Sequence, residues 1–161
     1  MKIETQHFRE ILSCYPTGVS VITSVDAAGE RLGMVVGSFT SISLDPALVG
    51  FFVDEGSSTW PRIERSGRFC VNVLAAHQAD LCHRFAAPGT DRFALLGHGA
   101  SPSGLPLLDD SAAWIDCAID QTVKIGDHWL AVGRVLALGS DGGHAPLLFY
   151  RKGLRPLSPH K

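Results

Sequence analysis

Two stretches rich in hydroxyl side chains are the places where this sequence could hold a polar ligand. The first, Gly33–Pro46, reads GMVVGSFTSISLDP, and a run of serine and threonine follows Gly37. A glycine within a strand often marks the close approach of a ligand or another backbone. Short hydroxyls can hydrogen-bond such a ligand without filling its space. An ordinary strand with a wet Ser/Thr face explains the same residues, and this local evidence alone favours it.

The second stretch, Asp54–Trp60, reads DEGSSTW and ends immediately before Pro61. Ser58 or Thr59 is a good N-cap, and Pro61 suits the first turn of a helix. Free N–H groups at a helix start, flanked by serines, form an anion site that needs no lysine. Plain helix capping is an equally good explanation of this segment.

Metal and nucleophile chemistry find little support in the sequence. The four cysteines contain no CxxC pair, so we expect them to be small core residues rather than zinc ligands or disulfide partners; they are Cys14, Cys70, Cys82 and Cys117. The seven histidines include one close pair, His77 and His83, whose spacing does not stack on a helix. We predict no metal, and no catalytic nucleophile or carboxylate pair is evident.

Composition limits the class of protein. The chain has 161 residues, which suits one domain over 1–161, and 45% of its residues are hydrophobic. Its net charge of -2, without a basic run, argues against nucleic acid or an anionic membrane as a partner. The N-terminus lacks the apolar core of a signal peptide, and no apolar run has membrane-spanning length. We therefore expect a cytoplasmic protein.

Hydrophobic periodicity predicts many short strands and a few helices. An apolar stripe of Phe8, Ile11, Leu12 and Tyr15 predicts a helix over 4–14. Ala47–Val53 is a continuous apolar run suited to a strand buried on both faces, and 87–111 is predicted to be loop. Further strands are expected at 19–25, from 34 onward, and at 69–74, 114–123, 129–138 and 146–150. Turns are expected at 26–29 and 126–127. Helices are expected after Pro61 and over 77–86, and a polar tail follows Tyr150.

Short strands at hairpin spacing favour a mainly β fold, an antiparallel barrel that is closed and decorated by helices, over a parallel α/β sheet. The glycines form no GxGxxG after a strand, so a Rossmann domain is not expected.

Four motifs occur in a fixed order: YPTGVSVIT, GSFTSISLDP, DEGSSTW and GDHWLAVGRV. The set resembles the flavin reductase-like family of FMN-binding split barrels from about Phe8 to Tyr150, and FCVNVL, LCHRFA and DRF strengthen the resemblance. It implies a homodimeric, Greek-key-like split β-barrel with an N-terminal helix, which holds FMN or FAD and reduces it with NADH or NADPH. Many members of this family supply the reduced flavin to a separate monooxygenase.

The resemblance also implies roles for individual residues. His128 would face the nicotinamide as the catalytic residue. The cofactor-binding residues would be Gly37, Ser38, Phe39, Thr40 and Ser41 along the flavin ring and ribityl chain, Ser57, Ser58 and Thr59 at the phosphate, Arg84, Phe85 and Arg92 at the outer flavin, and Asp127 and Tyr150 near the nicotinamide. Many members carry Asn or another polar residue where this chain has Gly37, which leaves the flavin preference open.

Flavin reduction fits the residue chemistry, because a protein that transfers hydride between two cofactors mainly stacks and orients their rings. Backbone N–H groups and hydroxyls near the flavin would stabilise the negative charge that develops on reduction. Two alternatives remain: a flavoprotein that keeps FMN and passes electrons to another acceptor, and a non-catalytic split barrel that binds flavin or haem.

Several of the implied site residues have structural explanations as well. His128 follows a Gly-Asp turn and is also explained as a surface histidine. Tyr150 is better explained as an aromatic that closes the barrel, whereas for Arg84 and Arg92 a solvated charge on a helix or loop is an equally good explanation. Side chains alternate along a strand, so Ser38 and Thr40 cannot share a face with Ser41. Some contacts must then come from the backbone, and Ser41→Ala is expected to have a smaller effect than the motif suggests.

Overall fold

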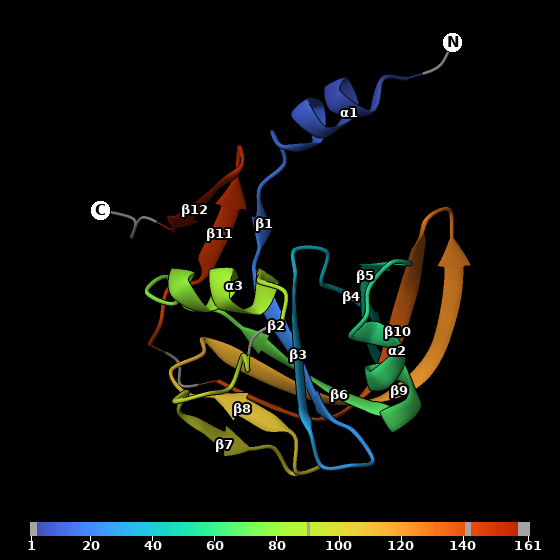
Figure 1. Cartoon of the computed structure of the whole chain (residues 1–161), viewed down its shortest axis with the longest axis vertical. Coiled ribbons are helices and arrows are strands. Elements are labelled where there is room, and N and C mark those ends of the chain that lie inside the picture. The colour runs from blue at the N-terminus through green and yellow to red at the C-terminus, as the bar shows by residue number, and fades with distance from the viewer. Residues whose placement is uncertain (1–2, 90, 141–142, 158–161) are drawn as a thin grey trace.

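The computed structural model describes residues 3–89, 91–140 and 143–157, and antiparallel strands dominate it. Seven strands form one sheet in the order β3-β2-β6-β9-β10-β5-β4 (Figure 1). The bounds of these strands are β2 Ser20–Val25, β3 Arg31–Val36, β4 Thr40–Leu44, β5 Ala47–Asp54, β6 Arg68–Val73, β9 Ala113–Ile125 and β10 His128–Gly139.

Two smaller sheets and three helices complete the described chain. The smaller sheets contain β1 Thr17–Gly18, β11 Leu147–Tyr150 and β12 Gly153–Pro156 in one, and β7 His98–Ala100 and β8 Pro106–Leu108 in the other. The helices are α1 Thr5–Leu12, α2 Trp60–Ser66 and α3 Ala79–Ala86. The mainly β, antiparallel class predicted from hairpin spacing is confirmed.

The expected closure of the barrel is wrong for the described residues. β3 and β4 follow each other in the chain but occupy opposite edges of the seven-stranded sheet. Gly37–Phe39 separates them and belongs to neither strand. The sheet is bent rather than closed (Figure 1), and the pairing of β9 with β10 shifts register next to Gly133. A Cβ on Gly133 would lie 2.4 Å from the Phe69 ring, so only glycine lets the strand pass this ring.

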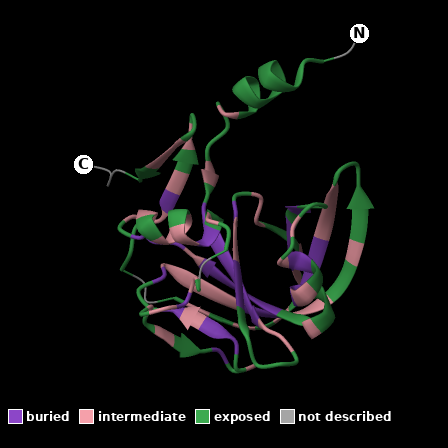
Figure 2. Ribbon diagram, viewed as in Figure 1, coloured by how far each residue is buried: buried purple, intermediate pink, exposed green. Residues whose placement is uncertain are grey.

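The helix predicted over 4–14 is present, but it packs against nothing in the described chain. α1 has no buried residue, and its apolar stripe faces outward, with Phe8 51%, Ile11 59% and Tyr15 73% exposed. Figure 2 shows this helix projecting from the body of the molecule. Its apolar side therefore has no partner within the described part of the chain.

The hydrophobic core divides between the two faces of the sheet. One cluster contains Phe51, Trp60 and Phe69, whose rings meet edge to face. The other contains Phe85 and Phe93 and lies under α3. The expectation that Ala47–Val53 is buried on both faces is wrong at Phe52, which is 38% exposed.

The loop predicted over 87–111 contains the β7–β8 hairpin, which sequence patterning did not reveal. Buried polar side chains of the main sheet hold this hairpin in place. Thr23 Oγ1 donates to the Pro106 carbonyl at 2.6 Å, and Asn72 Oδ1 accepts from the Leu108 N–H at 2.8 Å. The hairpin is short and depends on these distant partners, so its local sequence resembles a loop. β12 was likewise missed, because it lies in the polar tail.

The cysteine prediction is confirmed only in part. Cys70 and Cys117 are fully buried, and burial raises the pKa of each thiol to about 12. Cys14 is exposed and is not a core residue, whereas Cys82 is half-buried and packs against the core cluster that contains Phe85. Within the described ranges, no helix has both the length and the apolar character that a membrane crossing needs.

Candidate active site

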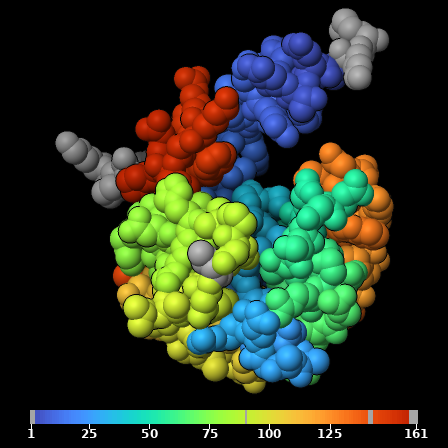
Figure 3. Space-filling model, viewed as in Figure 1, coloured from blue at the N-terminus to red at the C-terminus, as the bar shows by residue number. Residues whose placement is uncertain are grey.

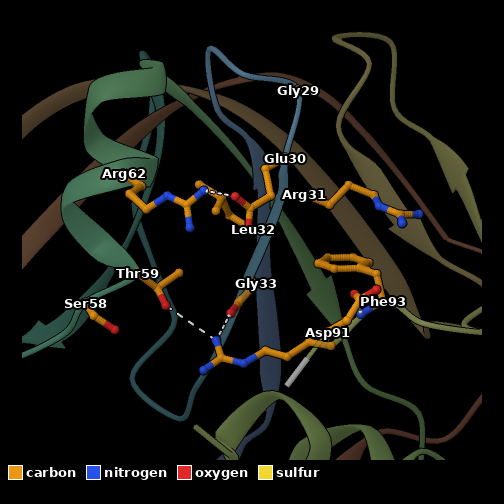
Figure 4. Close-up of a pocket in the computed structure, with 11 residues that line it drawn as sticks. Gly29, Glu30, Arg31, Leu32, Gly33, Ser58, Thr59, Arg62, Asp91 and Phe93 are labelled. Carbon is orange, nitrogen blue, oxygen red and sulfur yellow. Dashed lines mark hydrogen bonds and ion pairs between the residues drawn. The ribbon is translucent and has the colours of Figure 1, made fainter. Parts of the chain in front are cut away.

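A cavity of about 600 Å³ opens between three segments that are distant in the sequence. One wall is 29–33, from the β2–β3 turn and the start of β3; the second is the start of α2; the third is 91–93. Figure 3 shows the surface hollowed between the segments that carry α2 and α3, and Figure 4 shows the lining side chains. The lining is mostly polar, which suits a charged ligand rather than a purely apolar one.

The turn that forms the first wall is built by Asp26. Its Oδ1 accepts hydrogen bonds from the Ala28 and Glu30 N–H groups at 3.0 and 2.9 Å. Gly29 has a φ of 81°, which glycine adopts without strain. The turn predicted at 26–29 is thereby confirmed.

An ion-pair network ties this turn to α2. Arg62 Nη2 lies 2.5 Å from Asp26 Oδ2 and 2.6 Å from Glu30 Oε2 (Figure 4 draws Arg62 and Glu30). The Arg62 hydrogen bond lowers the pKa of Asp26, and the bond to Glu30 raises the pKa of Arg62. The network joins two walls of the cavity, and the carboxylates of Asp26 and Glu30 balance the charge of Arg62.

Arg92 connects the third wall to the other two. Its Nη1 donates to the Gly33 carbonyl at 2.5 Å and to Thr59 Oγ1 at 3.4 Å, and its Nε donates to the Ala87 carbonyl at 3.2 Å. Within the described ranges it forms no ion pair with a carboxylate. A guanidinium without a balancing carboxylate, beside the Ser58 and Thr59 hydroxyls, favours an anionic ligand.

The start of α2 differs in detail from the sequence expectation. Thr59 is the N-cap residue but makes no side-chain capping bond, and Pro61 lies in the first turn as expected. Ser57 Oγ instead accepts from the Trp60 N–H at 3.2 Å. The predicted N-cap position is therefore confirmed at Thr59, although its hydroxyl does not cap the helix, and the side chains of Ser58 and Thr59 line the cavity.

The segment Gly37–Ser41 lies beyond the far end of β3 and does not line the cavity. Ser38 Oγ donates to the Phe52 carbonyl at 3.0 Å and accepts from the Phe52 N–H at 2.9 Å. It therefore joins the β3–β4 connection to β5. Thr40 and Ser41 are exposed, and Phe39 is half-buried.

Arg84 and Phe85 are both engaged in packing on α3. Phe85 is 2% exposed and meets Phe93 edge to face at 5.2 Å. A Cβ on Gly33 would lie 2.2 Å from the Phe85 ring, so a glycine here lets α3 sit against β3. Arg84 Nη2 donates to the Ala94 carbonyl and steadies the loop beside the cavity.

The GDH motif at 126–128 contacts the start of DEGSSTW at 54–60, although the two motifs are at least 66 positions apart in the chain. His128 pairs with Asp54 across β10 and β5, and the Glu55 N–H donates to the Asp127 carbonyl at 3.0 Å. His128 Nδ1 lies 2.7 Å from Asp127 Oδ1, and this hydrogen bond lowers the pKa of Asp127. Neither residue lines the cavity.

Tyr150 lies in the small β1–β11–β12 sheet, with the Arg151 guanidinium 5.4 Å from its ring centroid. The structure thus brings Ser58, Thr59 and Arg92 together around one cavity and leaves the remaining predicted residues outside it. Sequence reasoning missed Glu30, Arg31 and Arg62, because no local pattern signals contacts made across more than 30 positions.

Among residues 3–89, 91–140 and 143–157, no group of three or more His, Cys, Asp or Glu side chains is placed to hold a metal ion.

Comparisons with known proteins show what the sequence and the fold of this chain are similar to. The chain is 46% identical over 151 residues to a flavin reductase of Pseudomonas putida, which covers 94% of this chain and 89% of that protein. Its fold matches nitrilotriacetate monooxygenase component B from Mycobacterium thermoresistibile with a TM-score of 0.92 and 38% identity, over 96% and 87% of the two chains. It also matches the Streptomyces globisporus NADH:FAD oxidoreductase SgcE6, solved with NAD and FAD fragments, with a TM-score of 0.91 and 29% identity over 99% and 98% of the chains.

Residues 12–158 match the family described as "Flavin reductase like domain", which is nearly the whole sequence. By this match and by the close relatives, the chain belongs to the flavin reductase-like family.

Proposed function

We propose that this protein is an NAD(P)H-dependent flavin reductase, which transfers a hydride from the nicotinamide to the flavin. Family membership and relatives such as the NADH:riboflavin 5'-phosphate oxidoreductase of Streptomyces pristinaespiralis, 35% identical over 96% of this chain, support this activity. The observation that carries the proposal is the cavity in which Ser58, Thr59 and Arg92 meet. A hydride-transfer protein needs a site of this kind to anchor its nucleotide by the phosphate.

The residues present fit a flavin phosphate. The Arg92 guanidinium has no carboxylate partner in the described chain and lies 3.4 Å from Thr59 Oγ1. A phosphate between this guanidinium and the two hydroxyls would accept charge-assisted hydrogen bonds. Arg92 is already fixed by the Gly33 carbonyl, so little side-chain entropy would be lost on binding.

The flavin ring is proposed to lie along Gly37–Ser41. The Ser38 hydroxyl is occupied by Phe52, so polar contacts in this segment must come from Thr40, Ser41 and backbone groups. These groups would orient the ring and stabilise negative charge on it. The bound flavin supplies the hydride-accepting chemistry, and the chain holds the two rings in register.

His128 is proposed to donate a hydrogen bond to the nicotinamide, with Asp127 holding its ring through the 2.7 Å contact. Arg84 and Phe85 are proposed to position the site without contacting the ligand, because they hold in place the loop and the helix that border the cavity. Tyr150 remains a proposed contact near the nicotinamide, although it lies in the small sheet.

The chain is proposed to act as a homodimer and to supply reduced flavin to a partner monooxygenase. The exposed apolar stripe of α1 has no partner in the described chain, and a second copy would cover it. A relative from Rhodococcus jostii, 43% identical over 99% of this chain, is named the reductase subunit of a flavin-dependent monooxygenase, HsaB. A single domain over 1–161 and a cytoplasmic location remain predictions from the sequence.

The decisive experiment measures NADH and NADPH oxidation with FMN, FAD or riboflavin added to the purified protein. Turnover that depends on added flavin supports a reductase that treats flavin as a substrate. Turnover of tightly bound flavin with a non-flavin acceptor instead points to a prosthetic group. Flavin binding without any NAD(P)H oxidation contradicts the proposed activity.

A further inference from the structure

We propose that a second cavity, between the β7–β8 hairpin and the start of β9, binds a small organic molecule that carries a primary ammonium group. This second cavity has a volume of about 450 Å³ and shares no lining residue with the cavity described above. Its lining comes from Gly99 in β7, from the segment 107–111 and from Trp114 in β9 (Figure 1 labels these strands). The proposal does not depend on flavin reduction.

The charge of the second cavity is negative. Asp109 and Asp110 both line it, and among the described residues no lysine, arginine or histidine does. Neither carboxylate forms an ion pair within the described ranges. Two carboxylates without a balancing cation favour a positively charged ligand, to which they can accept charge-assisted hydrogen bonds.

The hydroxyl of Ser111 is an independent sign of a ligand in the second cavity. Ser111 lines this cavity and is only 6% exposed, and its buried Oγ has no hydrogen-bond partner within the described chain. A buried hydroxyl in a native fold nearly always has a partner, so each exception needs an explanation. A ligand N–H group would supply the missing donor, since a serine oxygen can accept a hydrogen bond.

The backbone of Asp109 is fixed before any ligand binds. Its N–H donates to the Gly97 carbonyl at 3.3 Å, and its carbonyl accepts from Nε2 of the buried Gln78 at 2.8 Å. A Cβ on Gly97 would overlap Asp109 Oδ2, so the glycine leaves room for the carboxylate. A carboxylate on a fixed backbone loses less conformational entropy when it binds a ligand.

The rest of the second cavity suits an apolar ligand body. Leu107, Leu108 and the half-buried Trp114 contribute to its lining. A Cβ on Gly139 would lie 2.8 Å from the Trp114 ring, so the indole packs directly against this glycine. A Cβ on Gly99 would meet nothing within 4 Å, which leaves the space beside β7 open. The leucines favour a hydrocarbon group, and an indole face attracts a cation.

Other cations match these residues less well. Ca²⁺ takes about six to eight oxygen ligands, whereas no group of three or more His, Cys, Asp or Glu side chains in the described part of the chain is placed to hold a metal ion. A quaternary ammonium has no N–H to donate to Ser111. A primary ammonium on a compact hydrocarbon satisfies the carboxylates, the hydroxyl and the apolar lining together.

The test titrates the isotope-labelled full-length protein with cyclohexylammonium and follows the Trp114 indole N–H and the Gly99 amide by NMR. We expect saturable shifts of both signals, and binding of the neutral isostere cyclohexanol that is weaker by about tenfold or more. Asp109→Asn should weaken cyclohexylammonium binding about fivefold, and Ser111→Ala about threefold. Asp80→Asn, at an exposed position on α3 that lines neither cavity, is the matched control and should leave the dissociation constant unchanged.

Every other outcome overturns the proposal. Equal affinities for cyclohexylammonium and cyclohexanol would make the second cavity a merely apolar hollow. Tighter binding of Ca²⁺ at the same signals, lost in D109N, would make it a metal site. Tighter binding of tetramethylammonium would show that no N–H donor is recognised. Unchanged binding in both D109N and S111A, or no saturable shift of either signal, would place the ammonium elsewhere or nowhere, and the same spectra show whether each variant is folded.

Discussion

Arg92 Nη1 donates a hydrogen bond to the Gly33 carbonyl at 2.5 Å, which joins the loop after α3 to the first half of β3. The two residues lie 59 positions apart, and the same nitrogen also reaches Thr59 Oγ1. One guanidinium thus spans all three walls of the cavity, and its charge is directed to the place proposed for the flavin phosphate.

Arg92→Met should therefore weaken FMN and FAD binding by about tenfold or more, because a charge-assisted contact to phosphate contributes about 1.5–3 kcal/mol. Riboflavin has no phosphate, so its dissociation constant should stay within about twofold. Fluorescence titration of the three flavins measures the difference. A loss of riboflavin binding equal to that of FMN would show that R92M acts by deforming the site.

Gly33→Ala should destabilise the fold by about 1–3 kcal/mol or more, because overpacking a filled core forces side chains off their rotamers. The new Cβ would lie 2.2 Å from a ring atom of Phe85, which is almost completely buried. Urea denaturation measures the change. Gly99→Ala has nothing within 4 Å of its Cβ and should be nearly neutral; equal losses in the two variants would refute the packing explanation.

His128→Ala should raise the KM for NADH about fivefold and leave the flavin dissociation constants nearly unchanged, since one hydrogen bond is worth about 1 kcal/mol. Steady-state kinetics at saturating flavin give the KM, and His83→Ala on the exposed side of α3 is the control. Unaltered NADH kinetics in H128A would remove His128 from the nicotinamide site.

Asp26→Asn should remove part of the loss of stability in acid. Arg62 lowers the pKa of Asp26 below its ordinary value of 3.8 in the folded protein. A lowered folded-state pKa means that the stabilisation is present above about pH 4 and is lost as the pH falls through the folded value. Asparagine keeps the acceptor of the turn but removes the charge.

The measurement is the urea midpoint between about pH 2.5 and 6, at low and high salt. The contribution of the ion pair should shrink at high salt because the pair is partly exposed. Asp110→Asn, at an exposed position with a φ of 60°, should keep the acid dependence of the unaltered protein. Identical pH profiles for D26N and the unaltered protein would argue against the ion pair.

Ile11→Glu should shift the proposed homodimer toward monomer at micromolar concentration, because a charge in an apolar interface is costly to desolvate. Sedimentation velocity measures the assembly. The control is Gln6→Lys. Gln6 lies on the opposite side of α1, where it contacts Glu10, so this variant should leave assembly unchanged. A dimer that tolerates I11E must bury some other surface.

Much of the local structure could be predicted from the sequence. The turn at 26–29, the hairpin at Gly126-Asp127 and the apolar stripe of α1 depend on neighbours within a few positions, so residue spacing reveals them. Ser58, Thr59 and Arg92, which the family resemblance implies as binding residues, line one cavity in the structure, and their role there stays a prediction.

The tertiary structure alone decided how these pieces combine. The β7–β8 hairpin is held by buried hydrogen bonds to Thr23 and Asn72. The positive charge available in the cavity depends on which arginine forms an ion pair with a carboxylate. Among the described residues Arg62 forms ion pairs with carboxylates and Arg92 forms none, although both appear as ordinary charges in the sequence. Local spacing determines which side chains a strand or turn presents. Whether the charge of a side chain is balanced depends on partners from distant positions in the sequence, and only the folded chain brings those partners together.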